Sequence, residues 1–395
     1  MRKTLYFGIL LLFAAAPAAA AQDGLEGILS GIEENNRELS ALRSRIEADK
    51  CGYKAEIALE DPEFGFDYLW GNPDQGNRKD FSITQTLDLA LLFGSKGKLA
   101  KTRAELSDLE YKVERQRILL EDNKLCLEII YRNALDRELG RNLSQADSLK
   151  LLMEKLYNEG SIGRKDCGEA ALSATLARSE YNRNRIERDN LLAALAGMNG
   201  GEPVQLIVNE FAELEMLPAD FGEWYSEAED ASPVLAYVAQ QVNVSGQALK
   251  TGKIANAPKL TAGYMSELVT GSEFRGLTLG VTIPLWSVKN NVRQAKASYD
   301  ASVKYQEDAA ARYYTAMLQA YSRAQGLLDV LTDLESSMAE AEMTLRAVEQ
   351  RCALGESPVM ELLVERSLYT TLMKNTLEAR LDYHQALADL NAFKL

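Results

Sequence analysis

An internal repeat constrains this chain more than any other feature of its 395 residues. Pro62 and Pro258 lie 196 residues apart, and each precedes a short segment of alternating apolar residues. Gly160 and Gly355 lie 195 residues apart, and each stands where a long helical pattern stops. Landmarks that keep one offset indicate a tandem duplication. The sequence therefore predicts two structural copies of one unit.

The duplication predicts the domain organisation. A first repeat spans 22–199 and a second spans 234–395. The segment 200–233 between them is rich in Gly, Pro and acidic residues, so we expect an irregular linker, an equatorial segment between the two repeats. Each repeat has the order helix, β-hairpin, long helix, turn and returning helix. The β-hairpins are expected at 62–88 and 258–285, and the long helical hairpins at 98–198 and 293–393.

The strand segments alternate between apolar and small or polar residues. This period of two is typical of a half-buried soluble strand and also of a transmembrane barrel strand. Four strands cannot close a barrel, and an open sheet edge cannot lie in lipid. If the strands cross a membrane, several chains must pool them: two chains give 8 strands and three give 12. The candidate lipid-facing residues are Phe64, Phe66, Tyr68, Trp70, Leu277, Leu279, Val281 and Ile283.

The helices that follow the strands are unusually long. From Leu99 to Tyr157 the sequence contains no Pro, and over 320–352 apolar residues recur at spacings of three and four. Such spacing is typical of a coiled coil. We expect a mostly α-helical fold with long coiled-coil hairpins and four strands of transmembrane type. The turns at the two hairpin tips contain Gly160, Ser161 and Gly163 in the first repeat and Gly355, Glu356 and Ser357 in the second.

Residues 1–21 resemble a secretory signal peptide. Arg2-Lys3 is followed by a short apolar run, and Ala19-Ala20-Ala21 precedes Gln22 as a cleavage site. The chain is therefore expected to be exported. Its four cysteines could pair in an exported protein, and their spacing leaves that question open.

Composition excludes several functions. The net charge of −14 argues against a nucleic-acid binder. His384 is the only histidine, and the chain has no G-x-S-x-G, Walker or H-E-x-x-H motif. We predict neither an enzyme nor a resident metal or cofactor, and we expect His384 to be packed or on the surface.

The whole arrangement resembles the TolC-like outer membrane factor family, also called outer membrane efflux proteins. The resemblance rests on the duplication, on the prolines before the strands, on the tip glycines and on the matching endings that start at Arg185 and Arg380. It implies a homotrimer with a 12-stranded barrel in the bacterial outer membrane and an α-helical tunnel in the periplasm. It also implies that the tips dock onto a periplasmic adaptor, which links the channel to an inner-membrane pump for efflux or type I secretion.

The family also implies acidic residues at the periplasmic entrance, six and nine residues after each tip glycine. These positions hold Asp166 and Glu169 in the first repeat. The second repeat has Glu361, departs from the pattern at Val364, and has Glu365 one residue later. Trimerisation would place three copies of each carboxylate in a ring that favours cations.

A second function class stays open at this point. Long helical hairpins also occur in non-conducting periplasmic scaffolds and adaptors. Those adaptors usually carry one helical hairpin and additional β domains, whereas the sequence of this chain predicts two helical hairpins and too few strands for such domains. The exported substrate and the type of pump are not encoded in any feature of the sequence.

Overall fold

The computed structural model describes residues 18–73, 76–255, 257–269, 271–283 and 288–395. Most of the proposed signal peptide lies outside these residues, and its last four belong to the first helix. The elements in chain order are α1 (Ala18–Asn35), α2 (Arg37–Ala55), β1 (Glu63–Leu69), β2 (Arg78–Leu87), α3 (Leu89–Leu92), α4 (Ser95–Asn158), α5 (Arg164–Met198), α6 (Phe221–Ala231), α7 (Pro233–Ala255), β3 (Lys259–Val269), β4 (Ser272–Thr282), α8 (Val288–Ala353), α9 (Val359–Leu390) and a 3₁₀ turn η1 (Asn391–Lys394).

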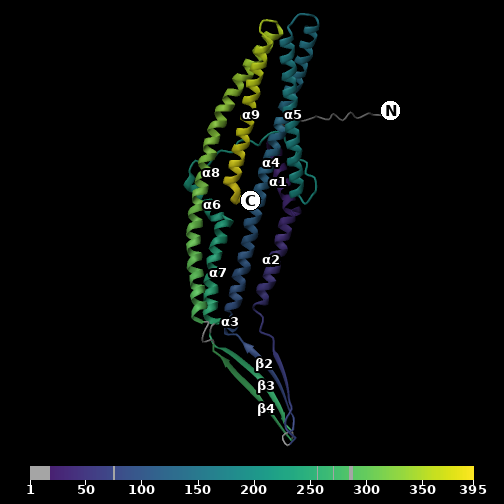
Figure 1. Cartoon of the computed structure of the whole chain (residues 1–395). Helices are drawn as coiled ribbons and strands as arrows, with labels where there is room; N and C mark the ends of the chain where they lie inside the picture. The colour runs from purple at the N-terminus through teal and green to yellow at the C-terminus, as the bar shows by residue number, and fades with distance from the viewer. Residues whose placement is uncertain (1–17, 74–75, 256, 270, 284–287) are drawn as a thin grey trace, which may run out of the picture.

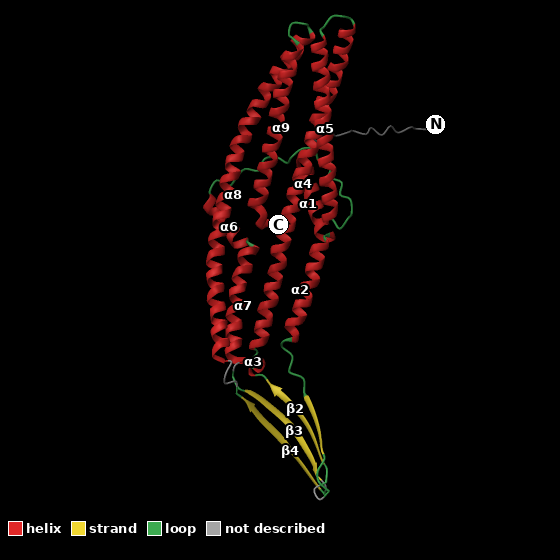
Figure 2. Cartoon of the chain, viewed as in Figure 1, coloured by secondary structure: helices red, strands yellow, loops and turns green. Residues whose placement is uncertain are grey.

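The molecule is elongated, with the sheet at one end and the two helical tips at the other (Figures 1 and 2). The helices α4 and α8 contain 64 and 66 residues. At 1.5 Å per residue each is roughly 100 Å long. The helices α2 and α7 accompany them on the sheet side, and α5 and α9 return from the tips. Among the helices of the described chain, none has a stretch both long and apolar enough to cross a bilayer.

Both long helices end in the same way. Gly160 and Gly355 adopt positive φ angles of 72° and 75°, which glycine reaches without strain. The next backbone N–H then reaches back over the last turn: Ser161 N donates to the Leu156 carbonyl, and Glu356 N donates to the Arg351 carbonyl, each at 2.9 Å. This pattern is a Schellman motif. It reverses the chain at the same point of both hairpins.

The four strands form one antiparallel sheet in the order β1-β2-β3-β4. The pairing of β2 with β3 joins the two predicted repeats, since Phe81 lies opposite Ser266 and Thr84 opposite Gly263. A Cβ atom on Gly263 would lie only 2.6 Å from the Ile83 carbonyl oxygen, so this position requires glycine. Within the described chain β1 and β4 have no further partner, and each leaves an open edge.

The expectation of an irregular linker at 200–233 is wrong for its second half. Asp220 caps α6, because its side chain accepts hydrogen bonds from the backbone N–H groups of Gly222 at 2.6 Å and Glu223 at 3.1 Å. Trp224 then enters a buried cluster with Leu331 of α8 and with Tyr383 of α9. The segment therefore forms part of a packed belt around the middle of the molecule.

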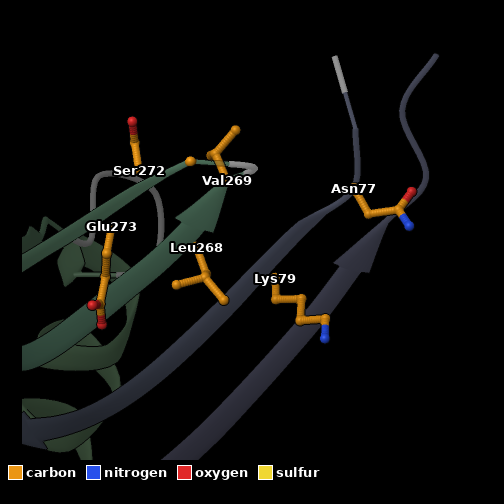
Figure 3. Close-up of a pocket in the computed structure, with 7 residues that line it drawn as sticks. Asn77, Lys79, Leu268, Val269, Ser272 and Glu273 are labelled. Carbon is orange, nitrogen blue, oxygen red and sulfur yellow. The ribbon is translucent and has the colours of Figure 1, made fainter. Parts of the chain in front are cut away.

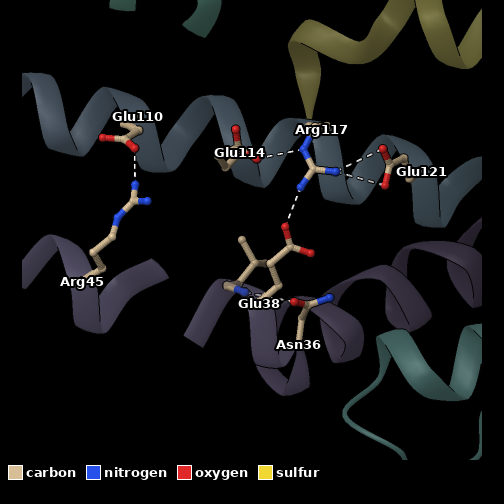
Figure 4. A network of polar contacts seen from close by, with 8 residues as sticks. Asn36, Glu38, Arg45, Glu110, Glu114, Arg117 and Glu121 are labelled. Atoms are coloured by element: carbon tan, nitrogen blue, oxygen red, sulfur yellow. Dashed lines mark hydrogen bonds and ion pairs between the residues drawn. The ribbon is translucent and has the colours of Figure 1, made fainter. Parts of the chain in front are cut away.

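Charged side chains attach α2 to α4 (Figure 4). Arg117 of α4 pairs with Glu38 of α2 at 2.6 Å and with Glu114 of its own helix at 2.8 Å. Arg45 pairs with Glu110 farther along. The contact of α7 with α4 is different, because it includes a buried hydrogen bond of 2.8 Å between the hydroxyls of Ser95 and Thr251. Both accompanying helices also bury apolar side chains, Leu39 and Ile46 on α2 and Val238 on α7, and they differ in the polar contacts that they add.

All four cysteines are free thiols in this structure: Cys51 is exposed, Cys126 is buried, and Cys167 and Cys352 are half-buried. Burial raises the pKa of the Cys126 thiol to about 12, so this side chain packs as a neutral group. The cysteine spacing left open whether any of the four form a disulfide, and in this structure none of them does.

Asp122 is a buried carboxyl group in the middle of α4. It is 0% exposed, and neither carboxylate oxygen has a hydrogen-bond partner among the described residues. Burial, with a smaller contribution from the charge of Glu121, raises the pKa of Asp122 to about 6. A raised folded-state pKa favours the protonated folded chain. The stabilisation is complete below the unfolded pKa of about 4 and is lost as the pH rises through about 6.

We therefore expect Asp122→Asn to raise the thermal unfolding midpoint at pH 8 by about 2–4 °C and to leave it nearly unchanged at pH 4. Thermal unfolding of the detergent-solubilised protein between pH 4 and pH 8 measures this. Asp329→Asn, on the exposed surface of α8, is the matched control and should show no such trend. An equal effect of Asp122→Asn at both pH values would contradict the assignment.

Candidate channel and docking surfaces

One face of the sheet is apolar across all four strands. Phe64, Ile83, Tyr264 and Leu277 lie directly opposite one another in register and so share this face. Phe66 continues it one step along β1, with its ring centroid 4.8 Å from that of its partner Phe81. Exposed aromatic and aliphatic side chains in one plane form a surface that water does not solvate well.

The predicted lipid-facing residues mostly lie on this exposed surface. Trp70 is 83% exposed and Leu277 is 86% exposed. Tyr68 is less exposed than the others and is half-buried, because its hydroxyl accepts a 2.7 Å hydrogen bond from Asn77 Nδ2 and its ring contacts Trp70. Ile283 is exposed but lies one residue beyond β4. The remaining members, all exposed, are Phe64, Phe66, Leu279 and Val281.

The opposite face of the sheet carries small and polar residues. Thr84, Gly263 and Thr278 form one row across β2, β3 and β4. Thr86 Oγ1 and Thr261 Oγ1 lie 3.4 Å apart in the next row toward the helices. A sheet with one apolar and one small polar face matches a barrel strand between lipid and a lumen.

The far end of the sheet, at the two hairpin turns, is polar (Figure 3). A shallow cavity of about 460 Å³ lies there, and its walls carry charges of both signs, Lys79 on β2 and Glu273 on β4. Arg78 links two strands, because it pairs with Asp80 at 2.8 Å and with Glu267 of β3 at 3.1 Å. The turn end is therefore suited to water and the middle of the apolar face is not.

The helical tips present mostly exposed backbone and polar side chains. Ser161, Gly163, Gly355 and Glu356 are exposed around the two turns. Ser357 is buried, because its hydroxyl donates a hydrogen bond to the Glu361 carboxylate. Gly160 supplies the turn described above. The proposed docking residues thus lie at the end of the molecule farthest from the sheet (Figure 1).

Two of the four carboxylates predicted for the entrance are paired within the chain. Glu361 accepts a hydrogen bond from Arg351 at 3.3 Å in addition to the one from Ser357. Glu169 lies 3.7 Å from Lys165. Asp166 in the first turn of α5 and Glu365 on α9 are half-buried, and no ion pair joins them to another described residue.

The structure brings parts of α5 and α9 together near these carboxylates. A groove of about 340 Å³ between the two helices is lined by Glu169 and Glu180 of α5 and by Met360 of α9. Lys374 of α9 crosses it to Glu180 at 2.7 Å. The basic partners at this end were missed from the sequence, although Lys165 stands four residues before Glu169, a spacing that places two side chains on one helical face.

The combination of two long helical hairpins with a four-stranded sheet defines a known class of fold, that of outer membrane channels. The chain superposes on the CmeC outer membrane channel of Campylobacter jejuni with a TM-score of 0.77 at 13% identity, over 94% of this chain and 85% of that one. For the outer membrane protein VceC of Vibrio cholerae the TM-score is 0.77 at 13% identity, over 95% and 97%. For the open state of the MtrE channel of Neisseria gonorrhoeae it is 0.74 at 18% identity, over 94% and 88%.

A family comparison agrees with the fold. Residues 224–393, which span most of the second repeat, match the outer membrane efflux protein family. Among curated proteins, none matches the chain. The family match and the shared fold confirm the resemblance drawn from the sequence and support a channel role in efflux. They also confirm the prediction that the chain is not an enzyme, since the family and these neighbours are channels.

The apolar face of the sheet leads to a test. We expect Phe66→Arg to reduce membrane insertion, at a cost of about 2–4 kcal/mol if the side chain lies near the middle of the bilayer. The yield of folded protein in the membrane fraction measures this. Asp67→Arg, one residue along and on the other face, is the matched control and should have a much smaller effect. Equal yields for both variants would contradict a lipid-facing strand and indicate that the strand belongs to a soluble sheet.

Proposed function

We propose that this chain is one subunit of a homotrimeric outer membrane channel that passively conducts substrate from an inner-membrane pump and its periplasmic adaptor to the exterior. The observation that carries the proposal is the open four-stranded sheet, apolar on one face, attached to two helical hairpins of great length. In this proposal the sheet lies in the bacterial outer membrane and the helices extend into the periplasm. The tip residues Gly160 to Gly163 and Gly355 to Ser357 face the adaptor.

The strand number supports a trimer. An isolated sheet of four strands exposes unpaired backbone groups on β1 and β4, and each such group is costly in lipid. Three copies supply 12 strands if β1 of one subunit pairs with β4 of the next. Closure of this kind removes every open edge.

The interior of the chain offers a template for the contact between subunits. In the proposed duplication, 22–199 and 234–395, helix α2 is the counterpart of α7, and α4 is the counterpart of α8. Helix α7 lies between α4 and α8 and contacts both. Helix α2 contacts α4 and has no long helix on its other side within the described chain. We infer that α8 of a neighbouring subunit lies there.

A native cysteine makes this contact testable. Cys51 is exposed on α2, and Gln247 stands at the equivalent place on α7, 196 residues later. Gln247 Nε2 donates a 3.3 Å hydrogen bond to the Ser95 carbonyl in the first turn of α4. The equivalent neighbour of Cys51 is therefore the first turn of α8 in the next subunit, around Lys289 and Asn291.

We expect a cysteine at position 289 or 291, introduced as Lys289→Cys or Asn291→Cys, to form a disulfide with Cys51 of a neighbouring subunit under oxidation. Non-reducing gels should show covalent dimers and trimers. Adding Cys51→Ser should abolish them, and Asp329→Cys, far from this contact, should give none. A stable monomer in the soluble periplasmic fraction would contradict the trimer, and cross-linking that persists without Cys51 would contradict the proposed contact between α2 and α8.

The entrance carboxylates give a functional test. Asp166 and Glu361 would occur in three copies each near the tips, and like charges in a ring attract multivalent cations. We expect the channel to be cation-selective and blocked by such cations. Asp166→Ala combined with Glu361→Ala should weaken the block in planar-bilayer recordings, whereas Glu227→Ala on α6 should not.

Three outcomes of these recordings distinguish the hypotheses. Block that weakens in the double variant supports the entrance assignment. Block that is unchanged assigns the carboxylates to the solvated helix surface and places the constriction elsewhere. A trimer that inserts into bilayers but conducts nothing would contradict the channel and favour the non-conducting scaffold.

A further inference from the structure

The apolar face of the sheet changes its chemistry close to the hairpin turns. Residues paired in register form rows across the four strands, and successive rows on one face are two residues, or roughly 6.6 Å, apart. A middle row consists of Phe64, Ile83, Tyr264 and Leu277. The last row on this face to span all four strands consists of Tyr68, Lys79, Leu268 and Glu273. A change from apolar to aromatic and charged side chains is typical of the level at which lipid tails meet headgroups.

Lys79 places an ammonium group at this level. It is exposed and lines the shallow cavity of about 460 Å³ at the turn end, and Figure 3 shows it on the same side of the sheet as Leu268 and Glu273. Its Nζ atom lies 5.7 Å from the centre of the Tyr68 ring, and no ion pair joins it to another described residue. Arg275, one row nearer the middle, is exposed and pairs with Glu273.

The two faces of the sheet carry different charges near the turns. In the described part of the strands, the apolar face has Lys79 and Arg275 against one carboxylate, that of Glu273. The other face has one cation, Arg78, beside a row of three carboxylates that pair in register, those of Asp67, Asp80 and Glu267. A phosphate group is therefore attracted to the apolar face and repelled from the other one.

A second hollow lies on the same face, nearer the middle of the sheet. Its volume is about 350 Å³, and Gly65 and Ser82, which pair in register, line it together with the apolar side chains of Phe64, Phe66, Phe81, Ile83 and Tyr264. Along β2, Ser82 is three residues from Lys79, which is roughly 10 Å at about 3.3 Å per residue. The cationic cavity and the apolar hollow thus follow one another along the same strand.

We propose that these two hollows bind one molecule of lipid A, the phosphorylated glycolipid of the outer leaflet. Its phosphate contacts Lys79 and Arg275, and one acyl chain lies in the hollow beside Phe66 and Phe81. Basic pockets at the membrane surface bind lipid headgroups in this way. A free phosphate ion would leave the apolar hollow uncovered, and an uncharged hydrocarbon would leave the ammonium group without an anion. The inference rests on the proposed function, because that function places the turn end of the sheet at the outer surface of the membrane.

The probe is diphosphoryl lipid A, titrated into the detergent-solubilised full-length protein and followed by native mass spectrometry. We expect saturable binding, and we expect the same lipid without its phosphates to bind at least about tenfold more weakly, because it lacks the charged acceptors. Inorganic phosphate at the same concentration should not displace the lipid, since it has no acyl chain. Displacement by inorganic phosphate would reduce the site to an ion site and overturn the proposal.

Variants locate the site. Lys79→Gln should weaken binding of lipid A about tenfold. Arg275→Gln should weaken it about threefold, because Arg275 also pairs with Glu273. Both side chains are exposed, so these variants keep the fold. Lys296→Gln, an equal change of charge on the exposed surface of α8, is the matched control and should bind lipid A as the parent protein does.

The same spectra report the oligomeric state, so failure of the lipid site and failure of the trimer are distinguishable. A trimer that binds both forms of the lipid equally, or that binds lipid A unchanged in Lys79→Gln and Arg275→Gln, would overturn the site and leave the proposed channel intact. A monomer that prefers the phosphorylated lipid through Lys79 would support the site and contradict the trimer. A monomer without that preference would overturn both.

Discussion

Unpaired backbone groups at the two edges of a small sheet are the constraint on which the rest of this structure depends. Strand β3 has a partner on both sides and so does β2 from Arg78 to Thr84, but β1 and β4 are each paired on one side only. Water can satisfy the remaining groups, and lipid cannot. The same sheet also has an apolar face, and exposing that face to water is unfavourable. Assembly with further copies resolves both problems at once, and this is why we propose a closed oligomer.

In the helical part, the two helices on the sheet side, α2 and α7, contact the long helices through different sets of side chains. Helix α2 buries Leu39 and Ile46, and ion pairs around Arg117 and Arg45 also join it to α4; surface pairs of this kind contribute little and weaken as salt is added. Helix α7 makes a buried hydroxyl contact and carries few charges. Helix α7 lies between α4 and α8, whereas the more charged α2 contacts α4 alone among the long helices and lies at the margin of the described chain, where a neighbour would complete its surroundings.

Much of the fold could be predicted from the sequence because periodic patterns determine it. Alternation from Phe64 to Trp70 predicts a strand, and the glycines at 160 and 355 predict the tips, since both effects are local. The helix α6 in the equatorial segment and its packing into the belt could not be predicted in the same way. Asp220 reads as one more acidic residue in a mixed segment, and only the folded chain shows that it caps α6 and leads Trp224 into contact with Tyr383.

In the candidate sites, too, local features could be predicted from the sequence and features that depend on tertiary packing could not. The sheet face follows from the period of two, because opposite residues in register share a face. The pairing of Glu361 with Arg351 and Ser357 depends on how a turn folds back, so a sequence pattern could not reveal it. The row from Tyr68 to Glu273 is still less local, because it requires β2 of one repeat to pair with β3 of the other.

The unbroken helices also act as levers. Large apolar clusters hold them at the belt. Near the tips, α4 and α5 meet at a cluster built on small side chains, Ala146, Ala174 and Ala177, whereas α8 and α9 meet at larger ones, Leu345, Val348 and Leu362. From Asp122 to Asn158 helix α4 extends roughly 54 Å at 1.5 Å per residue. A tilt of about five degrees about the belt therefore displaces the tip by about 5 Å, without breaking a backbone hydrogen bond along the way. Small rearrangements in the middle of the molecule are amplified into movements at the tip as wide as a hydrated ion.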